Sequence, residues 1–258
     1  MSGFLDLPAR SAKPREAGVT SVLDRGLSVA EVDALMEVAG DSVDLVKLGW
    51  GTALVTGNLD AKLERYRSHG VAVTFGGTLT ELAIRDDRVG AYIAWMRELG
   101  ISHVEVSDGT IELDADRKRD LIAAFVAEGF KVLSEVGSKD DQRIMAPYRW
   151  VELIKGELEA GAWKVIAEAR ESGTAGIYRP SGEVRMGLVD EIAHEIDHEK
   201  IVFEAPQKDQ QVWLLRRFGF ECNLGNIAPA EVLSLETLRL GLRADTVDLP
   251  RTDGAPPA

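Results

Sequence analysis

Eight short apolar runs along the chain each end in a polar residue. The residues that close these runs are Asp24, Lys47, Thr74, Glu105, Glu135, Glu168, Glu204 and Asn223. Runs such as V-D-L-V-K and I-V-F-E are short and rich in β-branched residues, which indicates buried strands. A charged side chain at the end of such a strand is costly to bury unless it is paired, bound to a metal or used in chemistry. These eight positions are therefore the first candidates for functional residues.

Most of the expected strands are followed by a segment with helical periodicity. The strands are expected at 18–24, 43–48, 71–75, 103–107, 131–135, 163–168, 201–204 and 221–225. The helices are expected at 28–40, 59–70, 88–100, 114–129, 149–161, 188–199, 210–219 and 229–243. Strands that alternate with helices predict a parallel sheet. Eight such units in about 250 residues are typical of a closed (β/α)₈ TIM barrel.

This pattern also divides the chain. Residues 1–17 form a lead-in segment, and residues 18–247 form the barrel, which is the expected catalytic domain. Residues 248–258 are rich in Pro, Gly and Asp, and we expect this tail to be disordered.

Strand parity predicts which side chains enter the barrel. Val104 and Val106 should face the helices, so Glu105 between them should point inward. The same argument turns Lys47 inward, and it also turns the glutamates that close the next three runs inward: Glu135, Glu168 and Glu204. The carboxyl ends of the strands carry the active site in this fold. The four glutamates could hold Mg²⁺ there. The alternative is a ring of structural ion pairs that closes the barrel.

Three loops after strands carry further candidates. The loop E-V-G-S-K-D over 135–140 would hold Lys139 above the barrel mouth as an acid, or leave it as a solvated surface lysine. Arg170, just past the sixth strand, offers a bidentate fork for a carboxylate or phosphate. The segment N-L-G-N-I over 223–227 could bind phosphate through the backbone amides of Gly225 and Asn226, or be a plain turn.

Three other features have a structural explanation at least as good as a functional one. H-E-I-D-H over 194–198 matches a zinc-binding pattern, but the apolar stripe of its helix places both histidines on the wet face, and no third ligand is evident. Cys222 should be a small buried core residue. Trp50 could line a site or serve as a packing element.

Composition narrows the function classes. The single cysteine excludes an internal disulfide and favours a reducing compartment, so we expect a cytoplasmic protein. The sequence shows neither a signal peptide nor a run of roughly 18 apolar residues, so no membrane association is expected. The formal net charge of -13 disfavours nucleic acid as a partner. A local cluster of Lys and Arg can still bind an anionic substrate.

Several segments, in this order, resemble the phosphosulfolactate synthase family. They are K-P-R-E-A-G-V-T-S-V-L-D-R-G, V-D-L-V-K-L-G-W-G-T, G-G-T-L-T-E, V-E-V-S-D-G-T, S-E-V-G-S-K, E-A-R-E-S-G-T-A-G-I, F-E-A-P-Q-K-D-Q-Q and N-L-G-N-I…L-E-T-L-R-L-G-L-R-A-D-T. They extend from about Lys13 to Thr246. Each motif is weak alone, and together they are specific.

The resemblance implies a (β/α)₈ barrel that adds sulfite to phosphoenolpyruvate with Mg²⁺. The product would be (2R)-3-phosphosulfolactate, on the way to coenzyme M and sulfolactate, and we expect a homo-oligomer. Lys139 and Lys47 would be catalytic. The substrate-binding residues would be Lys13, Arg15, Arg170, Asn223, Gly225 and Asn226. The metal ligands would be Glu105, Glu135, Glu168 and Glu204.

Two alternatives remain open at this stage. Ser138 stands where the resemblance leads us to expect a second lysine. A related enzyme that adds a different nucleophile to an enol phosphate is therefore a second hypothesis. A non-catalytic, heat-stress-associated homologue is a third. The inward carboxylates and lysines argue against it, because a binding module does not need that buried charge.

Overall fold

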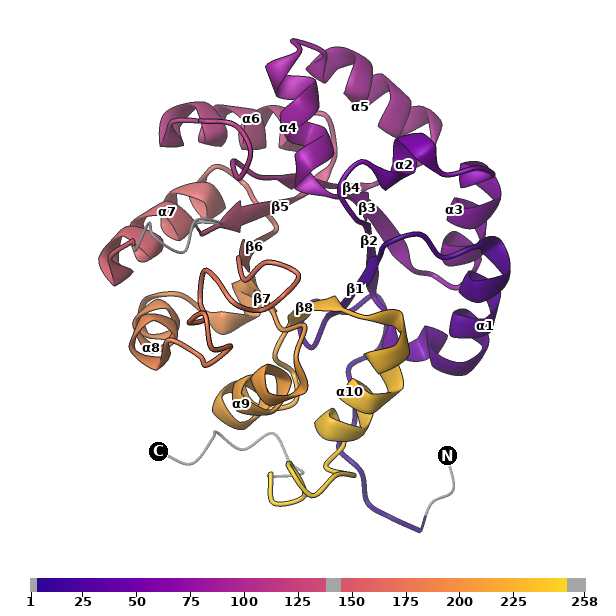
Figure 1. The fold of residues 1–258 in the computed structure, drawn as a ribbon, viewed down its shortest axis with the longest axis vertical. Coiled ribbons are helices and arrows are strands. Elements are labelled where there is room, and N and C mark those ends of the chain that lie inside the picture. The colour runs from indigo at the N-terminus through magenta and orange to yellow at the C-terminus, as the bar shows by residue number, and fades with distance from the viewer. Residues whose placement is uncertain (1–3, 138–144, 250–258) are drawn as a thin grey trace.

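The strands close into a barrel, as the sequence pattern predicts. The computed structural model describes residues 4–137 and 145–249. Its eight strands form one parallel sheet in the order β3-β2-β1-β8-β7-β6-β5-β4. The two end strands, β3 and β4, lie next to each other, so the sheet curls into a nearly closed TIM barrel with the helices in an outer ring (Figure 1). The predicted fold class is confirmed.

Every strand is short. The bounds are β1 Thr20–Asp24, β2 Leu45–Leu48, β3 Ala72–Phe75, β4 His103–Val106, β5 Lys131–Val136, β6 Lys164–Ala167, β7 Ile201–Glu204 and β8 Leu224–Ile227. The helices are α1 Val29–Ala39, α2 Thr52–Val55, α3 Leu59–Ser68, α4 Gly77–Arg85, α5 Val89–Glu98, α6 Ala115–Ala127, α7 Pro147–Glu159, α8 Met186–Glu195, α9 Lys208–Phe218 and α10 Val232–Arg239.

The barrel has two apolar regions, which follow from strand parity. The larger one lies between strands and helices and contains outward residues such as Val46, Val104 and Val165. The smaller one fills the barrel interior with Leu45, Leu133, Ile166 and Val202. This interior layer is the floor on which the polar residues at the strand ends rest.

Local signals explain most of the helix boundaries. Ser28 begins α1 with the predicted capping box, in which its side chain accepts from the Glu31 amide while the Glu31 carboxylate accepts from the Ser28 amide. Helices α2 and α4, which directly follow the loops after β2 and β3, were not predicted, and α4 begins on the glycine pair Gly76-Gly77. Among the described residues, no helix has both the length and the hydropathy needed to cross a bilayer.

The eighth strand differs from its predicted position. It spans Leu224–Ile227 rather than 221–225, so Asn223 precedes the strand instead of closing it. The pairing explains the shift, because Leu224 lies in register with Thr20 of β1 and with Phe203 of β7. The buried Cys222 just before it belongs to the large apolar core, as predicted, and burial raises the pKa of its thiol to about 12.

Candidate active site

Five charged side chains meet at the carboxyl end of the barrel. They come from β2, β4, β5, β7 and the residue after β6, and they are Lys47, Glu105, Glu135, Glu204 and Glu168. All five line one cavity of about 340 Å³. Each glutamate is at most 6% exposed. Strand parity therefore placed these side chains correctly, above the interior apolar layer.

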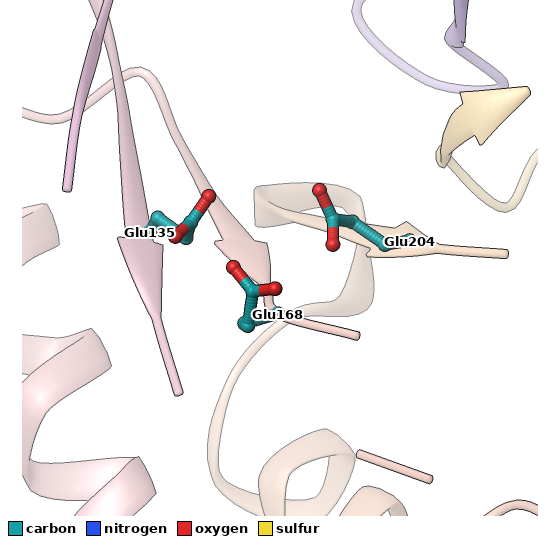
Figure 2. Close-up of side chains that lie close together, drawn as sticks. All are labelled: Glu135, Glu168 and Glu204. Atoms are coloured by element: carbon teal, nitrogen blue, oxygen red, sulfur yellow. The ribbon is translucent and has the colours of Figure 1, made fainter. Parts of the chain in front are cut away.

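Three of the glutamates form a compact cluster. One carboxylate oxygen from each of Glu135, Glu168 and Glu204 lies within 4.8 Å of the others. Figure 2 shows the three carboxylates turned toward one another from neighbouring strands. Buried carboxylates at this spacing repel one another, so nearby positive charge is needed to offset them. Oxygen ligands in this arrangement suit a hard dication such as Mg²⁺, so the donor set fits a metal site.

Lys47 pairs with glutamates on both sides. Its Nζ lies 3.1 Å from Glu204 Oε1 and 3.4 Å from Glu105 Oε2. Burial by itself lowers the pKa of the Lys47 ammonium, but the negative charges of the four surrounding glutamates raise it well above its ordinary value. Lys47 therefore stays protonated and acts as a fixed positive charge in the cavity.

Glu105 stands apart from the three-glutamate cluster. Its Oε1 accepts from the Gly77 amide at 2.7 Å, at the first turn of α4. A Cβ on Gly77 would collide with the Ser107 side chain, so the close approach of α4 to β4 requires glycine here. Burial raises the pKa of Glu105, and the Lys47 charge opposes that shift. Glu105 thus anchors α4 and pairs with Lys47, while its predicted role as a metal ligand stays a prediction.

Main-chain amides orient two glutamates of the cluster. The Ala169 amide donates to Glu204 Oε2 at 2.9 Å, and the Arg170 amide donates to Glu168 Oε1 at 2.6 Å. Arg170 has a positive φ of 58°. Gly176 also has a positive φ, and a Cβ there would lie 1.8 Å from the Glu168 carbonyl oxygen. The glycine lets the loop after β6 fold back onto Glu168.

The predicted loop residues on this side also line the cavity. Arg170 and Asn226 are among the lining residues. Gly225 lies in register with Glu204 on the inner wall. The Oδ1 atom of Asn226 is buried, and no hydrogen-bond donor among the described residues reaches it. Trp50 lines the same cavity while 44% exposed, which favours a role at the mouth over one in packing.

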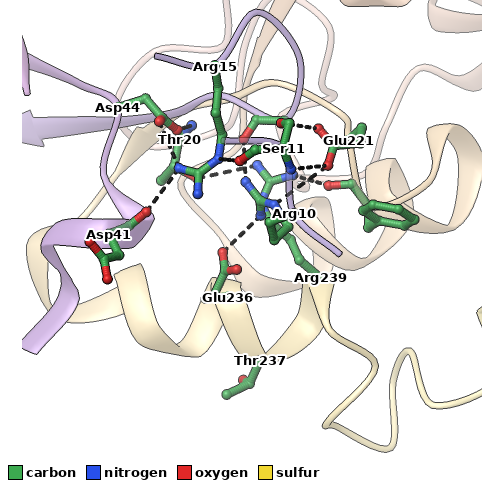
Figure 3. Close-up of polar contacts among 12 residues, drawn as sticks. Arg10, Ser11, Arg15, Thr20, Asp41, Asp44, Glu221, Glu236, Thr237 and Arg239 are labelled. Atoms are coloured by element: carbon green, nitrogen blue, oxygen red, sulfur yellow. Dashed lines mark hydrogen bonds and ion pairs between the residues drawn. The ribbon is translucent and has the colours of Figure 1, made fainter. Parts of the chain in front are cut away.

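Three predicted substrate-binding residues lie at the opposite end of the barrel. Lys13 donates to the Gly40 carbonyl oxygen at 2.9 Å. Arg15 lies 2.9 Å from the Asp44 carboxylate, which immediately precedes β2 (Figure 3). Asn223 accepts from the Val19 amide and donates to the Glu199 and Ile201 carbonyls. These partners all lie at the amino ends of strands, so the three residues secure the barrel's closed end and do not meet the cavity.

Two other positions of the expected polar ring also have structural roles. Asp24 faces α3, where it pairs with Lys62 at 2.6 Å and accepts from the Tyr66 hydroxyl. Thr74 points into the barrel beneath the charged residues. The histidines of the zinc-like pattern lie away from the cavity, and His198 stacks on Phe218. Lys139 lies outside the described residues.

Glu81 is a site residue that the sequence pattern did not predict. This fully buried residue of α4 accepts hydrogen bonds from the side chains of Ser107 and Thr110 and from the amides of Gly109, Thr110 and Ile111. Thr110 lines the cavity. Glu81 closes the motif G-G-T-L-T-E and binds the motif V-E-V-S-D-G-T, so two separate sequence motifs form one wall of the site. A lone acidic residue directly before the apolar run 82–84 was the available signal.

Comparison with solved structures places the fold among TIM-barrel enzymes. The chain resembles 3-hexulose-6-phosphate synthase from Salmonella typhimurium, with a TM-score of 0.57 and 15% identity over 87% of this chain and 100% of the other. It also resembles a phosphonopyruvate hydrolase solved with oxalate and Mg²⁺, with a TM-score of 0.51 and 15% identity over 93% of this chain and 87% of the other. At these identities the likeness shows the fold alone.

Comparison of sequences is more specific. The family model for (2R)-phospho-3-sulfolactate synthase (ComA) matches residues 8–245. The phosphosulfolactate synthase of Methanothermobacter thermautotrophicus is 44% identical over 245 residues, covering 93% of this chain and 95% of that protein. That of Bacillus subtilis is 42% identical over 245 residues, covering 94% of this chain and 97% of the relative. The chain therefore belongs to the phosphosulfolactate synthase family of enzymes.

Proposed function

We propose that this enzyme adds sulfite to phosphoenolpyruvate in the presence of Mg²⁺ and releases (2R)-phospho-3-sulfolactate, with the phosphate on the C2 oxygen and the sulfonate on C3. The observation that carries the proposal is the cluster of Glu135, Glu168 and Glu204 beside the permanently charged Lys47, in the cavity of a chain that belongs to this family. An anionic substrate can enter such a cavity only when cations offset the carboxylates.

The reaction requires one new bond and one proton. The sulfur lone pair of sulfite forms a bond to the methylene carbon C3, and the C2–C3 π pair moves toward C2 and the carboxylate. A proton then binds C2, and the phosphate ester remains intact. The barrier therefore depends on holding the extra negative charge and on delivering the proton to one face of C2.

The residues of the cavity fit these requirements. Glu135, Glu168 and Glu204 would hold Mg²⁺, which when bound supplies positive charge to the substrate carboxylate. Lys47 adds a second, fixed positive charge. Arg170 offers its guanidinium to phosphate or sulfite, and Asn226 lines the same cavity. We assign the proton at C2 to Lys139 from its sequence motif, although it lies outside the described residues.

The test is to incubate the purified protein with phosphoenolpyruvate, Mg²⁺ and a panel of nucleophiles that includes sulfite. Loss of the enol absorbance gives the rate, and ³¹P NMR with mass spectrometry identifies the product. We expect turnover with sulfite that stops with EDTA and returns with Mg²⁺. Turnover with another nucleophile and none with sulfite would instead support the alternative that Ser138 suggests.

A matched set of metals tests the ligand assignment. Mg²⁺ should restore activity after EDTA, since oxygen ligands suit it. Recovery with Zn²⁺ alone, abolished in His194→Ala, would point to the histidine pair and contradict the carboxylate site.

A further inference from the structure

The main chain at Glu135 extends past its neighbouring strand. The last residue of β4, Val106, lies in register with Ser134 of β5. Glu135 is therefore one residue beyond the end of β4, and no residue of β4 lies opposite it. A side chain supplies the hydrogen bond that β4 does not reach far enough to make: Lys118 of α6 donates from Nζ to the Glu135 carbonyl oxygen at 2.5 Å.

Lys118 is held by charges from two other segments. Its Nζ lies 3.0 Å from Glu157 Oε1 on α7 and 3.3 Å from Asp108 Oδ1 in the loop after β4. The other Glu157 oxygen accepts a hydrogen bond from Ser134 Oγ, the residue before Glu135. Lys118 and Glu157 are each 3% exposed. The cluster thus joins α6, α7 and the loop after β4 to the end of β5.

Stability alone is a weak reason for this arrangement. A buried ion pair loses much of its attraction to desolvation, and apolar residues of similar volume are often as stabilising. An apolar residue could not donate to the Glu135 carbonyl oxygen. The charge also lies directly behind the strand that carries one glutamate of the three-carboxylate cluster, on the side away from the cavity.

We propose that Lys118 is a positioning residue for Glu135 and so sets the affinity of the glutamate cluster for a divalent cation. The inference rests on the proposed magnesium site. Lys118 touches neither substrate nor cation. It fixes the main chain from which the Glu135 carboxylate extends, and its partners Glu157 and Asp108 fix Lys118 in turn.

The experiment compares Mg²⁺ binding by matched variants of the full-length protein. Lys118→Met alone would leave Glu157 as an unpaired buried charge and endanger folding. The double variant Lys118→Met/Glu157→Gln removes both charges and keeps an acceptor for Ser134. Isothermal titration calorimetry on the metal-free protein should show Mg²⁺ binding about 10–100-fold weaker than in the wild type, the usual cost of losing a group that orients a metal ligand.

The control is another buried ion pair on the helix-facing side of the barrel. Lys62 and Asp24 are paired between α3 and β1, and neither lines the cavity that holds the three glutamates. Lys62→Met/Asp24→Asn should leave Mg²⁺ affinity unchanged, provided that circular dichroism shows both double variants folded. In turnover assays, excess Mg²⁺ should restore the kcat of Lys118→Met/Glu157→Gln, because the cation concentration compensates for the affinity.

The outcomes separate this inference from the proposed function. Wild-type affinity in a folded Lys118→Met/Glu157→Gln variant would overturn the positioning role and leave the magnesium site standing. Equal losses in both double variants would also overturn it, since any buried pair would then have the same effect. A wild-type protein that binds no Mg²⁺ would refute the magnesium site itself, and this inference with it.

Discussion

The environment of Lys47 in the cavity fixes its protonation state. Lys47 is buried between Glu105 and Glu204, and the surrounding carboxylates raise the pKa of its ammonium well above the ordinary value. It therefore remains a cation across the neutral range and cannot serve as a general base there. Its role in the proposed reaction is to offset substrate charge.

We predict that Lys47→Met lowers kcat/KM on the order of 10²–10³-fold, the usual cost of removing a preorganised group that stabilises developing charge. Steady-state kinetics with phosphoenolpyruvate and sulfite measures the change. Lys155→Met is the control, because Lys155 forms an exposed ion pair with Glu195 on the outer helices. A Lys47→Met enzyme as active as the control would show that the lysine only balances charge in the folded protein.

We predict that Lys139 donates the proton that binds C2 in the proposed reaction. Lys139→Ala should lose on the order of 10²–10⁴ in kcat, the typical contribution of a general acid. The variant should still bind phosphoenolpyruvate and Mg²⁺ in calorimetry. Lys139→Arg should not rescue it, because arginine does not release a proton at neutral pH. Normal turnover of Lys139→Ala at saturating substrate would show that Lys139 is only a surface charge and not the general acid.

At the scale of elements, the loop between β4 and α6 depends on one carboxylate. Glu81 on α4 accepts from donors on four residues of the segment 107–111, which includes the cavity-lining Thr110. A buried carboxylate with several donors holds a loop firmly, and its loss leaves those donors unsatisfied at about 1–3 kcal/mol each. The loop segment that forms this wall of the active site is therefore held in place by its hydrogen bonds to α4.

Glu81→Ala should accordingly mobilise residues 107–111. Hydrogen–deuterium exchange should be faster there than in the wild type, while the distant helix α9 keeps its protection. Glu98→Ala provides the comparison, since Glu98 is an exposed residue near the end of α5. Unchanged exchange over 107–111 in Glu81→Ala would show that the loop is held by its other contacts.

Sequence periodicity anticipated some elements better than others. Period-two alternation turned Lys47 and the four glutamates inward because each lies inside or at the end of a strand flanked by apolar residues. The same logic misplaced Asn223, because the apolar residue Cys222 extended the run before β8 and only pairing with β1 and β7 sets the true start. Glu81 was missed because α4 itself was not predicted, and periodicity does not reveal which loop a buried acid contacts.

At the scale of the whole molecule, sequence could not decide which end of the barrel the lead-in segment occupies. Lys13 and Arg15 look like anion ligands, yet they bind carbonyls and a carboxylate before β2, at the closed end. Arg10 and the buried Arg239 extend this network (Figure 3), where Arg10 pairs with Glu236 of the last helix. The closed end thus joins the first and last segments of the fold, while the mouth carries the chemistry.

That closed end also contains a titratable group that links pH to stability. His103 begins β4, lies edge-on to Trp163 and is 9% exposed. Burial first, and the positive charge of Lys131 second, lower the pKa of its imidazole from 6.5 to about 4, against the opposing effect of Glu16. Between these two pH values the unfolded chain binds a proton that the folded chain does not, so unfolding becomes easier as the pH falls from 6.5 toward 4.

The shift corresponds to about 3 kcal/mol of stability lost across that window. We predict that His103→Gln removes this part of the pH dependence, so that its free energy of unfolding falls less steeply between pH 6.5 and 4 than that of the wild type. Urea denaturation at a series of pH values measures the free energy of unfolding of both proteins. The carboxylates are the same in both, so their contribution cancels when the two pH dependences are subtracted. His69→Gln is the matched control, because His69 is exposed at the end of α3 and should leave the wild-type slope intact. Parallel curves for His103→Gln and the wild type would show that the buried imidazole takes up its proton in the folded barrel as readily as in the unfolded chain.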